Sequence, residues 1–231
     1  MDWNAAVEKH REALKRVLAT LVAMAGFPVL HACGGATLPR RLHRALLALL
    51  RPAEAAARRL VIVAARGLVV ELTMGGRKPV GIPNGGGGTR ATPPRPGFRL
   101  FDPLPRWARR TPQAAVPRIS VPGFNAPFPI MERRAPSPHD PIGAAPLARR
   151  LQTLGSVLDD LPRHARRFAR WQAAKAEKND PRPGRFRRIW PLRPGRPPGH
   201  RSRRRRRSAH EVHAVLDDLH GLALWALGDT S

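Results

Sequence analysis

The chain has 231 residues, of which 42 are Lys or Arg and 16 are Asp or Glu, giving a formal net charge of +26 at pH 7. Such an excess cannot be neutralised within the chain and indicates a polyanionic partner. The single cysteine, Cys33, excludes an intramolecular disulfide framework and a metal site built from several cysteines. The 26 Pro and 20 Gly residues cluster at 75–146 and 181–199, so helices are expected mainly outside those ranges.

A first helix is predicted from about Asn4, a good N-cap residue, to about Ala25. The segment from Val17 to Cys33 carries no formal charge and ends in Leu-His-Ala-Cys, which loosely matches the cleavage box of a bacterial lipoprotein signal. Three interpretations are open: a helix that is soluble or lies on a surface, a signal whose Cys33 is lipidated, or a transmembrane anchor. Acidic residues before the segment and its length of seventeen residues favour the first.

A second helix is predicted to start with Thr37 as cap and Pro39 in the first turn. Pro52 either kinks this helix or begins a new one. Three arginines recur every seven residues and therefore share a face, which serves either as a phosphate ladder or as a solvated surface. They are Arg44, Arg51 and Arg58. The two helices are expected to form an antiparallel hairpin over residues 1–72.

Residues 73–146 are predicted to be extended or disordered because Pro and Gly recur throughout. The glycine run after Asn84 lacks the Lys-Ser/Thr pair that opens a helix in a phosphate loop, so it is interpreted as a flexible linker. Aromatic residues beside arginines in this segment suit either stacking on single-stranded bases or anchoring on the helices. The nearly uncharged stretch 117–130 is expected to pack on the protein or on a partner.

Residues 147–178 are predicted to form an amphipathic helix that Pro162 interrupts, followed by a basic helix with aromatic residues. An Arg/Pro-rich basic linker is expected at 179–207. A final amphipathic helix is expected at 208–228, with Ser208 as its cap.

One face of the final helix carries side chains of metal-ligand type, namely His210, His213, Asp217 and His220. A single straight helix rarely places more than two ligands around one ion. We therefore interpret this face as solvated, and no metal or other cofactor is expected.

The strongest functional signal is the stretch from Arg163 to Arg207, which holds eighteen of the 42 basic residues against two acidic ones, a net of +16. Arginine binds phosphate bidentately and stacks on bases. The candidate nucleic-acid contacts are Arg163, Arg166, Arg167, Arg170, Arg187, Arg188, Arg203, Arg204, Arg205, Arg206 and Arg207, with Trp171, Phe186 and Trp190 as stacking residues.

Four short stretches resemble small uncharacterised Arg- and Pro-rich proteins of GC-rich alphaproteobacteria. They lie at 1–6, 38–44, 122–130 and 210–225. The resemblance extends over most of the chain, implies no activity and assigns no functional residue.

These patterns predict a mainly α protein, with a small core made of the N-terminal hairpin and two later helices. The expected function is that of a non-enzymatic, cytoplasmic accessory protein, which binds nucleic acid through its phosphates without strong sequence readout. Two alternatives remain: a membrane-associated protein that binds anionic lipid, and a scaffold for an acidic protein partner. No nucleophile with an evident base is found, so an enzyme is not expected.

Overall fold

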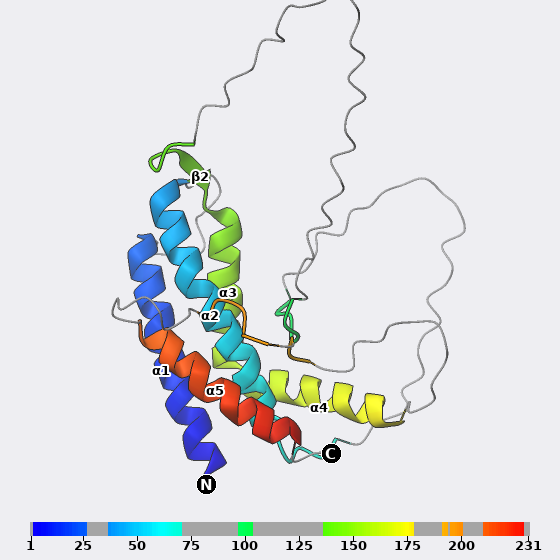
Figure 1. Cartoon of the computed structure of the whole chain (residues 1–231). Helices are drawn as coiled ribbons and strands as arrows, with labels where there is room; N and C mark the ends of the chain where they lie inside the picture. Colours follow the sequence, from blue (N-terminus) through cyan, green and yellow to red (C-terminus); the bar gives the residue numbers. More distant parts are fainter. Residues whose placement is uncertain are drawn as a thin grey trace, which may run out of the picture.

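The computed structural model describes residues 2–26, 37–70, 97–103, 136–177, 191–193, 195–200 and 210–228. Within these ranges the protein is mainly helical, with five helices and one small sheet, which confirms the predicted fold class (Figure 1). The helices are α1 (Trp3–Ala25), α2 (Arg40–Ala64), α3 (Ala145–Asp159), α4 (Leu161–Glu177) and α5 (Glu211–Gly228). The strands are β1 (Thr37–Pro39) and β2 (Pro141–Gly143).

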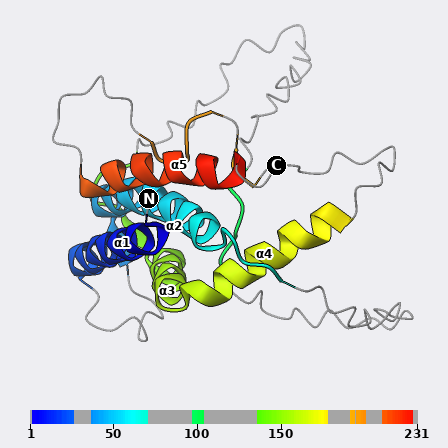
Figure 2. The same ribbon diagram turned by 90° about the horizontal axis from the view of Figure 1, so that it is seen from below.

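Helix α2 is the centre of the fold. It runs antiparallel to α1, as the sequence predicted, and it contacts α1, α3, α4 and α5 (Figures 1 and 2). Ala55, Ala56 and Ala57 are fully buried, and the small alanine side chain lets neighbouring helices approach closely from several sides.

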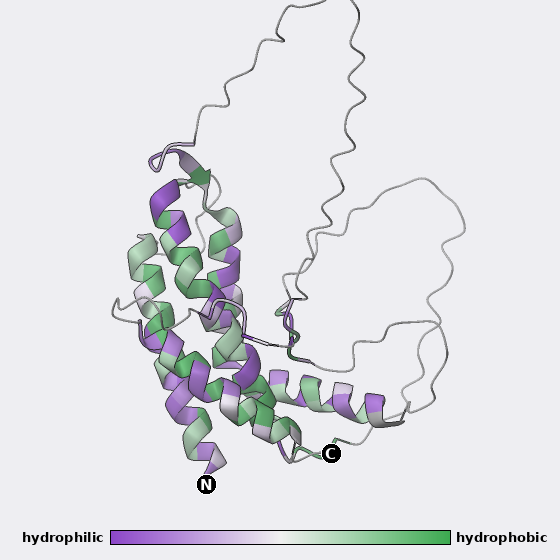
Figure 3. Ribbon diagram, in the orientation of Figure 1, coloured by the Kyte–Doolittle hydropathy of each residue, from purple (hydrophilic) through white to green (hydrophobic). Residues whose placement is uncertain are grey.

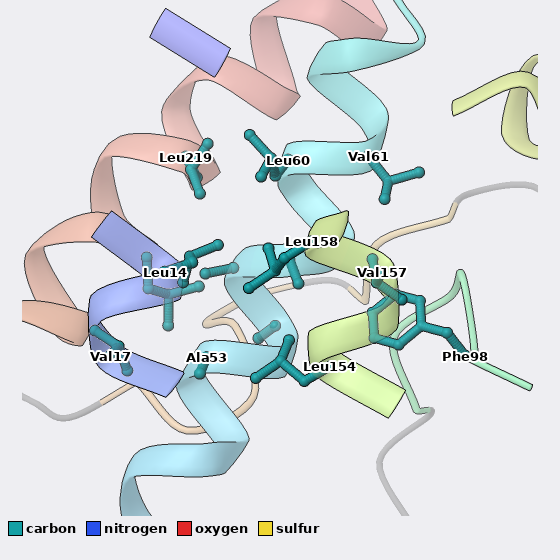
Figure 4. Packing of buried hydrophobic residues seen from close by; sticks show 14 of the residues in the cluster. Leu14, Val17, Ala53, Leu60, Val61, Phe98, Leu154, Val157, Leu158 and Leu219 are labelled. Atoms are coloured by element: carbon teal, nitrogen blue, oxygen red, sulfur yellow. The ribbon is translucent and has the colours of Figure 1, made fainter. Parts of the chain in front are cut away.

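The core lies where the helices converge on the second half of α2. Figure 4 shows Leu14 from α1, Leu60 from α2, Leu158 from α3 and Leu219 from α5 gathered at this point. All four side chains are fully buried. Full burial of one leucine side chain contributes about 1.5–3 kcal/mol, so this junction supplies much of the stability.

The start of α1 differs from the prediction. Asp2 rather than Asn4 is the N-cap, and its Oδ1 accepts hydrogen bonds from the backbone N–H groups of Asn4 at 3.0 Å and Ala5 at 3.1 Å. Both residue types cap well, but only Asp2 lies far enough upstream for the first turn to begin at Trp3. The helix ends at Gly26, whose φ of 66° is the left-handed conformation that glycine adopts readily.

The start of α2 also differs from the prediction. Thr37 does not cap the helix but pairs with Gly143, in a short antiparallel ladder between β1 and β2. The backbone N–H of Arg40 donates to the carbonyl oxygen of Asp140 at 2.9 Å, and that of Arg41 donates to Pro138 at 2.9 Å. Because this turn satisfies the exposed N–H groups, α2 begins without a capping side chain.

Pro52 lies inside one continuous helix, so it does not begin a new one. Its backbone is crossed by the segment 195–200. A Cβ atom built on Gly199 would lie 2.5 Å from the Pro52 nitrogen, and the φ of Gly199 is +83°. Glycine is therefore required at 199 for both spacing and backbone conformation.

The predicted break between α3 and α4 falls at Asp160, and Pro162 is the second residue of α4, where its missing N–H costs nothing. Helix α5 begins at Glu211, after His210, whose Nδ1 accepts a hydrogen bond from the Val212 N–H at 3.2 Å. The expected cap Ser208 lies outside the described residues, as does Cys33.

No helix in the described part of the chain combines the length and apolar character that crossing a bilayer requires. Most of the Pro/Gly-rich segment 73–146, including 117–130 and the glycine run, lies outside the described residues.

Candidate functional site

Helix α4 presents a basic face to solvent. Its four arginines follow a spacing of three, one and three residues, which places them on one side of a helix. They are Arg163, Arg166, Arg167 and Arg170, and all are exposed. The opposite side, with Leu161, Ala165 and Phe168, is buried against the rest of the protein. Figure 3 shows hydrophilic residues recurring on successive turns of α4.

Little negative charge offsets this face. Arg163 lies 4.0 Å from Asp160, but both side chains are more than half exposed, so the pair contributes little. Arg167 Nη1 donates to the carbonyl oxygen of Phe98 at 3.3 Å, which uses one of its donors without neutralising its charge. Burial, together with the positive charge of Arg167, lowers the pKa of His164 on the same helix.

Trp171 has a packing role in the structure. Its ring lies 4.9 Å from that of Phe101 and 5.5 Å from that of Phe168, and it is only partly exposed. It therefore joins α4 to the segment 97–103. The other candidate contacts lie outside the described residues: Arg187, Arg188, Arg203, Arg204, Arg205, Arg206, Arg207, Phe186 and Trp190.

The seven-residue arginine series of α2 does not form one surface. Arg44 and Arg51 are exposed, but Arg58 is only 7% exposed. The physical reason is that the segment 97–103 packs on Arg58, whose guanidinium pairs with Asp102 and donates to the carbonyl oxygen of Arg99.

Arg59 and Asp102 form a fully buried ion pair that sequence reasoning missed. Both side chains are 0% exposed, and Arg59 Nη2 donates to Asp102 Oδ2 at 2.9 Å. Arg59 also donates from Nη1 to the carbonyl oxygen of Ala55 at 2.7 Å and from Nε to His220 Nδ1 at 3.1 Å. Because Nδ1 accepts this bond, the proton of the neutral His220 ring is on Nε2. The pKa of His220 is lowered, mainly by burial and also by the positive charge of Arg59.

His213 and His220 therefore do not lie on a solvated face, contrary to the prediction. His213 is 8% exposed, and His220 faces the buried Arg59. The buried face of α5 is therefore wider than the stripe of apolar residues along it, because it also includes His213. Within the described ranges, no group of three or more His, Cys, Asp or Glu side chains is arranged to hold a metal ion.

The ion pair continues into a network at the surface of α2. Asp102 Oδ1 lies 3.6 Å from Arg58 Nη1, and Glu54 lies 3.7 Å from Arg58 Nη2. Arg150 donates to both oxygens of Glu54 at 2.8 Å, and this hydrogen bond raises the pKa of Arg150. Arg58 Nε donates to the carbonyl oxygen of Arg99 at 3.0 Å. These contacts fix the segment 97–103 on α2.

A cleft of about 350 Å³ opens beside this network. It lies between α2, α3 and the segment 97–103. Its lining residues are Glu54, Arg58, Gly97, Phe98, Arg99, Pro103, Arg149, Arg150 and Thr153. The lining residues thus include four arginines and one glutamate, a composition that favours an anion.

A signal for the buried pair was present in the sequence. Arg58 and Arg59 interrupt a run from Ala55 to Val63 in which every other residue is apolar. A charged side chain in such a run needs a buried partner. The partner, Asp102, stands alone in a Pro-rich basic segment, and nothing in the spacing connects it with Arg59.

Comparison with known proteins found no matching family model, no similar curated protein and no similar solved structure. The resemblance to small alphaproteobacterial proteins therefore stays a prediction.

Proposed function

We propose that this protein binds nucleic acid through the phosphate backbone, with the arginine face of α4 as a principal contact surface, and that it is not an enzyme. The supporting observation is that four exposed arginines share one face of α4 and that, among the described residues, only Asp160 pairs with one of them. Helix α4 also extends away from the bundle of α1, α2 and α3 (Figures 1 and 2), which leaves this face accessible.

The chemistry of this face favours contact with phosphates over reading of bases. Arginines at spacings of three and four residues along a helix can each meet a different phosphate oxygen. The only aromatic residues described on α4, Phe168 and Trp171, are buried or packed against neighbours. We therefore expect binding with little sequence preference, and we expect the protein to act in the cytoplasm, where its polyanionic partner is present.

The membrane-surface alternative is less well supported. It needs the apolar face of α1 to enter the lipid interface. In the structure that face is inside the core, where Leu14, Val17 and Leu21 are at most 1% exposed. Insertion would therefore expose part of the core of the bundle.

The test is a salt series of duplex binding by the full chain. Replacing Arg163, Arg166, Arg167 and Arg170 together with glutamine removes up to four phosphate contacts. We expect weaker binding and a slope of log affinity against log salt that is shallower by about 3 to 4, since each phosphate contributes about 0.9. The matched control replaces four exposed basic residues away from α4 and outside the stretch 163–207, namely Lys9, Arg41, Arg44 and Arg51.

A slope that changes equally in both quadruple variants would show that only net charge matters and that α4 is not the contact surface. Binding of the unaltered protein that does not depend on salt would contradict the proposal altogether. Anionic vesicles in place of duplex test the membrane alternative, which predicts binding after nuclease treatment.

A further inference from the structure

We propose that the cleft between α2, α3 and the segment 97–103 is a binding site for one phosphate monoester group. This site goes beyond the proposed function, because its ligand and its residues differ from those of the α4 face and its existence does not depend on nucleic-acid binding.

The charges that line the cleft favour a dianion. Glu54 neutralises Arg150 through two hydrogen bonds of 2.8 Å, and Arg58 is shared between Glu54 and Asp102. Among the described residues, neither Arg99 nor Arg149 has a carboxylate within ion-pair distance. Asp102 also pairs with Arg59, so three guanidinium groups share the carboxylates of Glu54 and Asp102. With Arg99 and Arg149 added, the described residues around the cleft carry an excess of three positive charges, and a phosphate monoester carries about −1.5 to −2 at pH 7.

Arg99 and Arg149 lie on parts of the backbone that are fixed by contacts within the fold. The backbone of Arg99 is fixed by the hydrogen bond from Arg58 Nε to its carbonyl oxygen at 3.0 Å. Three residues further on, Asp102 is anchored in the core by Arg59. Arg149 lies in the second turn of α3. A rigid backbone limits the entropy that the site loses when it binds a ligand to the ordering of its side chains.

The size and composition of the cleft suit a small phosphorylated group. Its volume of about 350 Å³ lies within the range of roughly 300–1,000 Å³ of small-molecule pockets. Phe98 and Pro103 supply apolar wall for the part of the ligand that bears the phosphate. An internal phosphodiester carries only one negative charge, so a free nucleotide or the phosphorylated end of a strand fits better.

Calorimetric titration of the full chain with adenosine monophosphate tests this site, with adenosine as the uncharged comparison. We expect one saturable site for the nucleotide and none for adenosine. Replacing Arg99 and Arg149 with glutamine is expected to weaken binding by about 10-fold for each lost charged hydrogen bond. Both side chains are exposed, and folding of the variant is checked by its thermal midpoint.

The matched control replaces Arg163 and Arg166 of α4 with glutamine, which removes the same charge without touching the cleft. Nucleotide affinity is expected to stay within about 2-fold. A 5′-phosphorylated oligonucleotide compared with its 5′-hydroxyl form tells whether a strand end also enters the cleft. The proposal is overturned if no phosphate monoester binds, or if both double variants weaken nucleotide binding equally.

The two sites can fail separately. Both proposals are supported if duplex binding is lost in the quadruple α4 variant and nucleotide binding is unchanged when only Arg163 and Arg166 are replaced. Nucleotide binding that depends on Arg99 and Arg149 in a protein with no affinity for duplex supports the cleft alone and contradicts the proposed function.

Discussion

Replacing Asp102 with alanine removes the carboxylate that neutralises the most deeply buried charge in the structure. Arg59 is 0% exposed, so its guanidinium cannot turn toward water when its partner is lost. Breaking such a pair costs about 3–5 kcal/mol. Arg58 lies 3.6 Å from the same carboxylate and is 7% exposed, so two cations lose a partner together. We therefore expect about 4–5 kcal/mol, the upper part of this range.

The assay is urea denaturation followed by far-ultraviolet circular dichroism, supported by the thermal midpoint. A loss of this size lowers the midpoint by about 8–20 °C in a chain of this length. Asp159→Ala is the matched control, because Asp159 is an exposed carboxylate on α3. Combining Asp102→Leu with Arg59→Met removes both charges and should recover much of the stability. A loss below about 1 kcal/mol for Asp102→Ala, similar to that of the control, would refute the reasoning.

Three further outcomes are expected. Burial and the neighbouring Arg59 lower the pKa of His220 below its usual 6.5, so the unfolded chain binds more protons than the folded chain as pH falls. The free energy of unfolding should therefore fall between about pH 7.5 and 5.5. Urea midpoints should show a less steep fall in His220→Asn. Ala57→Leu should cost about 1–3 kcal/mol by overpacking the core, whereas the exposed Ala45→Leu should be nearly neutral in the same urea titration. Gly199→Ala should lower the thermal midpoint, because the added Cβ would clash with the backbone of α2. Gly221→Ala should raise it, because the added Cβ meets nothing within 4 Å and alanine favours the helix. The opposite order would contradict the crossing of α2 by the segment 195–200.

The helical core could be predicted from the sequence because its signal is local. The stripe of Leu147, Leu151, Leu154 and Leu158 has helical spacing, and all four side chains are buried in the structure. The basic face of α4 was predicted for the same reason. Local sequence patterns predicted the starts of helices less reliably. The first N–H groups of α2 donate to carbonyl oxygens of the turn at 138–140, so Thr37 does not cap the helix and pairs with Gly143 in a strand instead.

The cleft and the buried pair could not be predicted because their parts are far apart in the chain. Arg59 and Asp102 are 43 positions apart, and Arg59 and His220 are 161 apart. Spacing rules describe neighbours on one helix and give no information on which segments meet. The burial of Arg59 was deducible from its apolar surroundings, but the identity of its partner was not.

The position of α5 on the centre of α2 has a consequence for how the chain reaches its folded state. Residues 211–228 cover α2 together with α1, although about 150 positions separate them from α2. Closing a loop of that length carries an entropic cost that is recovered only when the final contacts form. A nascent chain that has emerged only to α4 therefore still exposes the apolar surface of α2 that α5 covers in the folded protein, and exposed apolar surface of this kind favours aggregation.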